Sequence, residues 1–139
     1  MRARVRASIE RQSMMATLGV ELIAVERGRV QLALRHDDRF TQQHGLLHAG
    51  AVAAVLDSAC GYAAYSVMRP DASVLTATYT INLLAPAAGS RFTMTGQVVR
   101  AGRTLVVCRG EAFADGSAAP FAVMQATMTA LYDRPGPRG

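Results

Sequence analysis

The sequence has few cysteines and few aromatic residues, and both shortages exclude classes of protein. Only Cys60 and Cys108 are present, which is too few for a disulfide framework, and each lies in an apolar segment. We therefore expect two buried free thiols. Aromatic residues make up 6% of the chain and do not interleave with its scattered arginines. The formal net charge of +5 therefore does not indicate a nucleic-acid partner, because no stacking platform accompanies it.

A long uninterrupted apolar run is also missing. The longest candidate, Ala51 to Met68, is rich in alanine, contains Ser58 and Gly61, and carries Asp57 near its centre. A charged residue at that place argues against a membrane span. The N-terminal segment MRARVRASIERQS has no apolar stretch after its arginines, as a secretory signal would. These features predict a cytoplasmic protein without a membrane partner.

The length of 139 residues, half of them hydrophobic, suits one domain with a substantial core. No internal repeat or linker divides the chain. We expect a single domain over 1–139, with an N-terminal extension over 1–17 and a disordered tail over 134–139.

The first half of the chain alternates helical and extended patterns. The alanine-rich apolar run predicts a long helix, and because it is apolar all round we expect it to be buried. Gly19 is a stop signal for an earlier, short helix, and Arg69-Pro70-Asp71 ends the long one. The predicted order is a helix over 6–18, strands over 20–25 and 30–35, a polar loop over 36–44, and the long helix.

The second half reads as strands alone. Leu75, Tyr79 and Leu83 alternate with threonines, and Pro or Gly turns separate the runs. Consecutive strands joined by short turns should pair antiparallel. The predicted strands are 74–84, 91–100, 104–113 and 119–132. The predicted fold class is therefore α+β, with an antiparallel sheet wrapped around one long central helix and a short N-terminal helix beside it.

Asp57 is the only charged residue in the long apolar run. Its helical face carries small residues, which leave space for a backbone or an extended ligand to approach the carboxylate; they are Ala53, Ala54, Cys60, Gly61 and Ala64. A partly desolvated carboxylate suits general-base or nucleophilic catalysis. The alternative is an aspartate that neighbouring Ser, Thr or Arg side chains hold for structural reasons.

The start of the same helix supplies possible hydrogen-bond donors. The N–H groups of Gly50 and Ala51 have no intrahelical partner in the predicted helix and lie at its positive end. They could bind a carbonyl oxygen that gains negative charge, or they could be solvated or capped by a loop side chain. Gly50 and Asp57 are about 10 Å apart along the helix, too far to act on one carbonyl group. A site that uses both therefore needs two chains.

His44 and His48 have the spacing His-x-x-x-His, but they lie on a glycine-containing loop. Only His36 is available as a further histidine, so the face and the third ligand that zinc requires are missing. We expect no metal and no cofactor.

One group of residues resembles a known family. Gln42 precedes His48 by six residues, Asp57 follows it by nine, and His-Ala-Gly stands at the entrance to the long helix. These spacings and the element order resemble the hotdog-fold thioesterases of the phenylacetic-acid-degradation type, with their His-Gly-Gly loop. The resemblance implies hydrolysis of acyl-coenzyme A thioesters, with Asp57 as nucleophile or general base.

The resemblance also implies roles for other residues. Gln42 would donate its amide to the thioester or position water, and His48 would hold the loop through hydrogen bonds. Thr76 matches a position that helps to orient water, although an ordinary strand threonine would look the same. Arg100 and Arg103, near a strand turn, are candidates to bind the phosphates of coenzyme A.

The same family builds its active sites at a dimer interface, and its dimers commonly pair into tetramers. We therefore expect a homo-oligomer, a dimer of dimers, acting on aromatic or medium-chain acyl groups. Ala49 departs from the family by replacing the first glycine of the loop, which puts the oxyanion site in doubt if that position needs a positive φ. The motif of the hydratase branch is missing. A non-catalytic acyl-CoA-binding or regulatory module remains the alternative.

Overall fold

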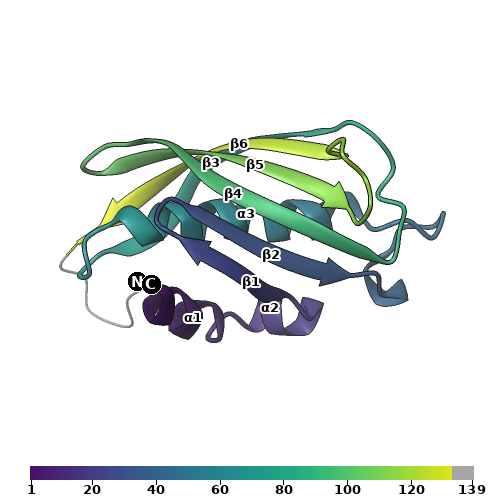
Figure 1. Ribbon diagram of the computed structural model, residues 1–139, viewed down its shortest axis with the longest axis horizontal. Helices are drawn as coiled ribbons and strands as arrows, with labels where there is room; N and C mark the ends of the chain where they lie inside the picture. The colour runs from purple at the N-terminus through teal and green to yellow at the C-terminus, as the bar shows by residue number, and fades with distance from the viewer. Residues whose placement is uncertain (133–139) are drawn as a thin grey trace.

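The structure is a computed structural model that describes residues 1–132 (Figure 1). The predicted tail over 134–139 lies outside these residues. Two short helices are followed by two strands, a long helix and four strands. Their bounds are α1 Arg2–Ile9, α2 Ser13–Leu18, β1 Glu21–Glu26, β2 Arg29–Arg35, α3 Ala49–Val67, β3 Ser73–Leu83, β4 Arg91–Ala101, β5 Leu105–Ala114 and β6 Ala122–Leu131, with a 3-10 turn at Asp38–Phe40.

All six strands form one antiparallel sheet in the order β1-β2-β4-β5-β6-β3. This confirms the predicted α+β class, in which the sheet wraps around one long helix (Figure 1). The expectation that consecutive strands pair was wrong for β3 and β4. The seven-residue connection over 84–90 carries the chain away from β3, so that β4 pairs with β2 while β3 pairs with β6.

Helix α3 fills the concave face of the sheet. Twelve of its nineteen residues are buried, which agrees with a run that is apolar nearly all round. Gly96 on β4 makes the close approach possible, because a Cβ there would meet the backbone carbonyl of Ala59 at 2.3 Å. Gly110 is its partner on β5, and a Cβ there would meet the Sγ of Cys60 at 3.0 Å. Facing glycines thus form the trough in which the helix lies.

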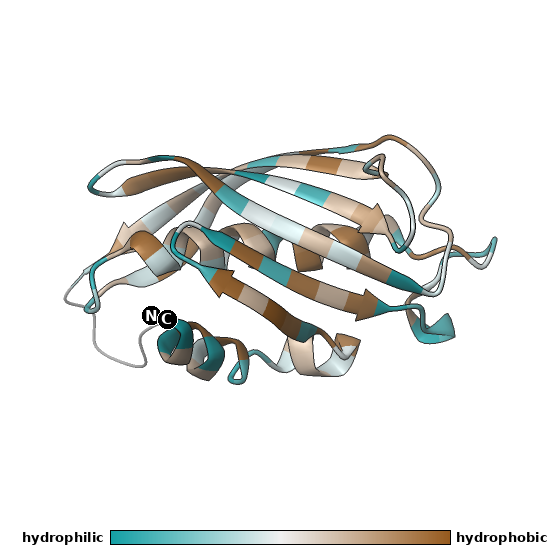
Figure 2. Ribbon diagram, in the orientation of Figure 1, coloured by the Kyte–Doolittle hydropathy of each residue, from teal (hydrophilic) through white to brown (hydrophobic). Residues whose placement is uncertain are grey.

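Alternating inward and outward residues are clearest on the inner strands. On β4, Phe92 and Met94 are buried, while Thr93 between them is only half-buried. Figure 2 shows hydrophobic and hydrophilic bands following one another along β2. Cys60 and Cys108 both lie in this core as free thiols, as predicted. Burial raises the pKa of both thiols, so neither is a reactive thiolate at neutral pH.

Strand β3 is one of the two edge strands of the sheet, the other being β1, and it is exposed along most of its length. Leu75, Tyr79 and Leu83 are between 43% and 53% exposed. The pairing with β6 shifts between Thr76 and Thr78, which is a β-bulge at Ala77. Thr76 consequently lies opposite the buried Met128, on the helix side of the sheet, where simple alternation would have turned it away.

The N-terminal segment forms two helices, not the single helix predicted over 6–18. Gln12 has an extended backbone, with φ −83° and ψ 103°, and separates α1 from α2. Gly19 ends α2 in the left-handed conformation at φ 72°, as its stop signal predicted. Val5 and Met15 are buried in the common core, so both helices belong to the domain. Within residues 1–132 no helix is long and apolar enough to span a membrane.

Candidate functional site

Asp57 lies in the middle of α3 and is half-buried, with its carboxylate beside the edge strand. Thr76 donates a hydrogen bond from Oγ1 to Asp57 Oδ1 at 2.7 Å. The bulge in β3 is what turns this threonine toward the helix. The structure therefore brings together two residues that the sequence singled out separately.

The environment of Asp57 favours its neutral form. Partial burial raises the pKa of this carboxyl group, and the hydrogen bond from Thr76 opposes the shift by stabilising the charged form. Asp57 has no ion-pair partner among the described residues. A carboxylate that is poorly solvated and unpaired is a better base than one in water.

A hollow of about 200 Å³ opens beside the carboxylate, and we call it the acid hollow. Gly61 and Tyr62 line it from α3, Thr76 and Met128 from the sheet, and Gln12 from the N-terminal segment. No side chain fills the space next to Gly61, since a Cβ built there would meet nothing within 4 Å. The acid hollow can therefore accept a small organic group directly against Asp57.

The loop before α3 is shaped by Gln42. Its side-chain Oε1 accepts hydrogen bonds from the backbone N–H groups of His44, at 2.6 Å, and Leu46, at 3.2 Å. Gly45 completes the turn with φ 78°. The oxygen of the Gln42 amide is thus used to hold the loop, while its Nε2 has no acceptor among residues 1–132.

His48 caps the N-terminus of α3. Its Nδ1 accepts a hydrogen bond from the N–H of Gly50 at 2.7 Å, and its carbonyl oxygen accepts from Ala51 at 3.0 Å. These two amides therefore have partners, which is the capped alternative that the sequence left open. A loop side chain and a loop carbonyl reach back over the first turn of the helix. The cap also explains Gly50, because a Cβ there would meet His48 Nδ1 at 3.0 Å.

The amide that the cap leaves unused belongs to Ala49, the first residue of the helix. Its N–H has no acceptor among the described residues, and Ala49 is exposed. Ala49 and Gln42 line a second hollow, of about 240 Å³, together with Leu47 and Leu83. We call it the donor hollow, because two unpartnered N–H groups, those of Ala49 and of the Gln42 amide, belong to residues that line it.

The acid hollow and the donor hollow are separate within one chain. Asp57 lies eight positions after Ala49 on the helix, a rise of about 12 Å. Both hollows lie along the edge strand: Thr76 lines the first and Leu83 the second. One chain therefore presents an acid and a pair of donors at different places on the same edge.

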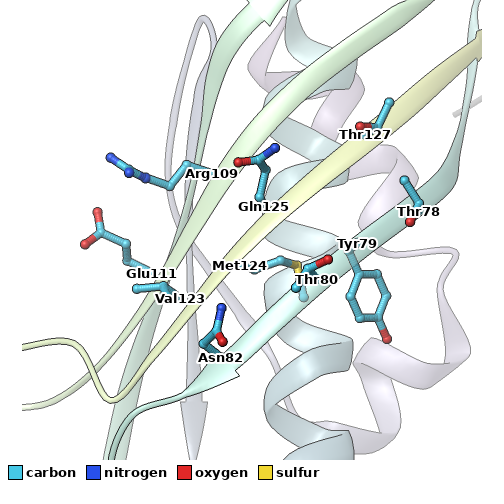
Figure 3. A pocket seen from close by; sticks show the side chains of 10 residues that line it. All are labelled: Thr78, Tyr79, Thr80, Asn82, Arg109, Glu111, Val123, Met124, Gln125 and Thr127. Carbon is cyan, nitrogen blue, oxygen red and sulfur yellow. The ribbon is translucent and has the colours of Figure 1, made fainter.

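Other candidate features lie elsewhere. Arg100 and Arg103 are exposed at the β4–β5 turn, and neither lines either hollow. A larger hollow, of about 640 Å³, lies on the sheet face away from α3, where Arg109, Glu111 and Gln125 line it (Figure 3). It is remote from Asp57 because these side chains point to the opposite side of the sheet from the helix.

Metal-binding groups are not gathered in residues 1–132, where no three His, Cys, Asp or Glu side chains could share an ion. His36 instead lies within 3.2 Å of Asp38, and His48 serves as the helix cap.

Ala49 and Gln12 are two lining residues to which the sequence assigned no role in a site. Ala49 could have been found by treating His48 as the N-cap, since the next amide is then the first of the helix. Gln12 gave no such signal, because its contact with the acid hollow joins segments about fifty residues apart in the chain.

Comparison with known proteins relates most of the chain to one family. The thioesterase superfamily matches residues 44–120, which include His48, Asp57 and Thr76. The crystal structure of a thioesterase family protein from Silicibacter pomeroyi is 49% identical, with a TM-score of 0.90, over 94% of this chain and 97% of that one. The E. coli PaaI protein of the phenylacetic acid degradation operon shares the fold at 20% identity, with a TM-score of 0.85 over 93% and 91% of the two chains.

Two relatives resemble the chain over a shorter stretch. A protein of Saccharolobus solfataricus named as an esterase is 33% identical over 90 residues, 65% of this chain but only 64% of its own length. The 1,4-dihydroxy-2-naphthoyl-CoA hydrolase of Listeria monocytogenes is 26% identical over 91 residues, 66% of this chain and 74% of that protein. The family match covers more than half of the described residues, and the fold is that of the hotdog proteins. The chain therefore belongs to the thioesterase superfamily.

Proposed function

We propose that the protein is an acyl-CoA thioesterase whose active site is shared by two chains. Asp57 of one chain acts as nucleophile or general base, and the donor hollow of the other binds the thioester oxygen. One observation carries the proposal: an unpaired, half-buried acid and two unpartnered N–H donors lie at separate places along the same edge strand, β3.

Strand β3 supports the sharing. It is an edge strand with exposed apolar side chains, which a second copy could cover by antiparallel pairing. A two-fold axis between Tyr79 and Thr80 would place Thr76 of each chain beside Leu83 of the other. Because these residues belong to the two hollows, each acid hollow would then adjoin the partner's donor hollow.

The chemistry follows from this juxtaposition. The thioester oxygen would accept hydrogen bonds from the Ala49 N–H and from Gln42 Nε2, which stabilise the negative charge that develops on it. The Asp57 carboxylate would either attack the carbonyl carbon or remove a proton from the attacking water. Collapse of the tetrahedral intermediate breaks the C–S bond and releases the coenzyme A thiolate. On the nucleophilic route the acyl group stays on Asp57 as an anhydride, which water then hydrolyses to the free acid. Thr76 would orient the carboxylate through its 2.7 Å hydrogen bond.

The acyl group would occupy the acid hollow. Its volume of about 200 Å³ somewhat exceeds that of a protein cavity known to hold benzene, about 150 Å³. This size favours aromatic or medium-chain acyl groups over long ones, and the naphthoyl-CoA named for the Listeria relative is of a related kind. Arg100 and Arg103 remain candidates for the coenzyme phosphates, and a dimer of dimers remains the expected assembly.

A thiol-release assay over acetyl-, hexanoyl-, octanoyl- and phenylacetyl-CoA tests the proposal. We expect turnover, with kcat/KM rising severalfold from acetyl-CoA to the larger acyl groups, because each buried methylene contributes up to about 0.8 kcal/mol. Tight binding of acyl-CoA without thiol release would favour the non-catalytic binding module instead. Turnover of simple esters alone would overturn the assignment to coenzyme A.

A further inference from the structure

Gln12 reaches the acid hollow from the junction of α1 and α2. Its Nε2 donates a hydrogen bond to the hydroxyl of Tyr62 at 2.7 Å, and both residues line the hollow. Tyr62 is only 2% exposed, and its hydroxyl lies 3.2 Å from the Oγ of Ser8. Gln12, Tyr62 and Ser8 therefore form a polar network at the acid hollow, the site that we propose for the acyl group.

The N-terminal segment that carries Gln12 is fixed to α3. The guanidinium of Arg4 donates hydrogen bonds to the carbonyl oxygens of Tyr65 and Met68, at the end of α3, and stacks over the Tyr65 ring at 4.1 Å. Val5 is fully buried beside it. Because these contacts fasten α1 to the long helix, the position of Gln12 is set by the core and not by a loose extension.

The network leaves one hydrogen-bonding atom without a partner. Tyr62 accepts from Gln12, so its own proton is available to Ser8. Gln12 Oε1 then has no donor among residues 1–132. A carbonyl oxygen in a half-buried side chain gains from a donor that a bound ligand supplies.

The spacing along α3 between Asp57 and the network corresponds to about the length of one substituted ring. Tyr62 lies five residues after Asp57, a rise of about 7.5 Å, with Gly61 and its open space between them. A single ring next to Asp57 would therefore bring its far end to the network. A donor on that end could reach Gln12, while an apolar end would leave Oε1 unpaired.

We propose that Gln12 is a specificity-determining residue that selects acyl groups about one ring long with a hydrogen-bond donor at the end remote from the thioester. The inference rests on the proposed function, since it assigns the acyl group to the acid hollow. A donor-bearing acyl group gains one hydrogen bond that its unsubstituted counterpart lacks, worth about tenfold in kcat/KM.

The test compares two substrates that differ by one ring hydroxyl, phenylacetyl-CoA and (4-hydroxyphenyl)acetyl-CoA, in wild type and in Gln12→Leu. We expect the wild type to prefer the hydroxylated substrate about tenfold and the variant to show a ratio near one. The ratio cancels any general loss of activity. Gln31→Leu is the matched control, because Gln31 is also half-buried and donates one hydrogen bond, to Thr95 at 3.3 Å, on the other face of the sheet.

An unchanged ratio in Gln12→Leu, with both substrates turned over, would overturn the inference and leave the proposed function standing. Failure of the wild type to hydrolyse any acyl-CoA would overturn the proposed function instead. If Gln12→Leu does not fold, as judged by circular dichroism, Tyr62→Phe decides. That variant keeps the ring but removes the hydroxyl that orients Gln12, so the ratio should fall severalfold, and an unchanged ratio would contradict the inference.

Discussion

The two hollows on the edge of the molecule are opposites. The acid hollow has a half-buried carboxyl group with a raised pKa, and the only group that donates to that carboxylate among the described residues is Thr76. The donor hollow has unpartnered N–H groups at Ala49 and Gln42 and no acidic residue in its lining. Under the proposed mechanism, each hollow would supply half of what acyl transfer requires.

The difference shows how one short chain can build a two-part site. Both hollows meet β3, an edge strand that has no neighbour on its outer side, so a second copy could complete each of them at once. Under the proposed mechanism, their separation along α3 would prevent either chain from completing its own site. Experiments that remove one half at a time can break this comparison or sharpen it.

Removing the acid should have the largest effect. Asp57→Asn keeps the shape of the side chain and an oxygen that can accept from Thr76. It removes the negative charge with which the carboxylate would attack the thioester carbon or activate water. We expect kcat for phenylacetyl-CoA to fall a hundredfold or more. Asp115→Asn makes the same chemical change in an exposed turn and serves as the control. A folded Asp57→Asn variant with near wild-type kcat would exclude Asp57 as the catalyst.

Removing a donor from the other hollow should cost about as much, up to roughly a hundredfold in kcat. Ala49→Pro deletes one N–H at the first position of the helix, where proline is well tolerated. His48 before it has φ −61° and ψ 138°, which suits a residue preceding proline.

Ala49→Gly distinguishes the effect of the amide from that of the methyl group, because it keeps the N–H while removing the side chain. It also restores the glycine of the related loops. We expect it to retain far more activity than Ala49→Pro in the same thiol-release assay. Equal losses in both variants would show that the methyl group matters and the amide does not.

Combining the two lesions in different chains tests the sharing itself. In a mixture of Asp57→Asn and Ala49→Pro subunits, each mixed dimer would contain one site with both lesions and one with none. Random exchange at equal amounts should restore roughly a quarter of the wild-type rate. Native mass spectrometry confirms the exchange, and no recovery after confirmed exchange would rule out a site built from two chains.

The fold could be predicted from the sequence because its signals are local. Gly19 ends a helix where the stop signal indicated, and the bounds of the strands shift by one to three residues at most. The break at Gln12 could not be predicted, since no glycine or proline marks it and contacts with Tyr62 stabilise it. The pairing of β3 with β6 could not be predicted either, because it depends on the path of the connection over 84–90 and not on the sequence of the strand itself.

The candidate site could be predicted in part for the same reason. The spacing of Gln42, His48 and Asp57 is a property of the sequence and can be read without the fold. Which amide stays unpartnered depends on a cap that only the folded loop reveals: the sequence offered Gly50 and Ala51 as donors, whereas the N–H without an acceptor among residues 1–132 is that of Ala49. Thr76 meets Asp57 because of a bulge, which interrupts the alternation from which strand faces are read.

Partly filling the acid hollow should have smaller effects, which raise stability and lower kcat/KM for the larger substrate. Gly61→Ala adds a methyl group in open space within a helix, which should stabilise the fold by about 0.5–1 kcal/mol. The same methyl group narrows the hollow, so kcat/KM for phenylacetyl-CoA should fall severalfold while that for acetyl-CoA changes little. Thermal unfolding and the two-substrate assay measure both. An equal loss with both substrates would place the acyl group elsewhere.

The smallest expected effect is that of Asp57→Asn on thermal stability. It depends on pH because the acid hollow contains an ionisable group, whereas the donor hollow has no charged residue in its lining. The folded-state pKa of Asp57 is raised above the unfolded value of about 3.9, so between the two values the folded chain holds more protons than the unfolded chain. The contribution to stability is therefore present below the unfolded pKa and is lost as pH rises through the folded one. An asparagine side chain cannot ionise, so Asp57→Asn should melt higher than wild type at pH 7, by a few degrees at most, with the difference vanishing near pH 3. Thermal unfolding of both proteins across this range, with Asp115→Asn beside them, measures it. A variant that melts lower than wild type at pH 7 would mean that the fold stabilises the charged form of Asp57. That result would contradict the view of Asp57 as a poorly solvated acid without an ion-pair partner.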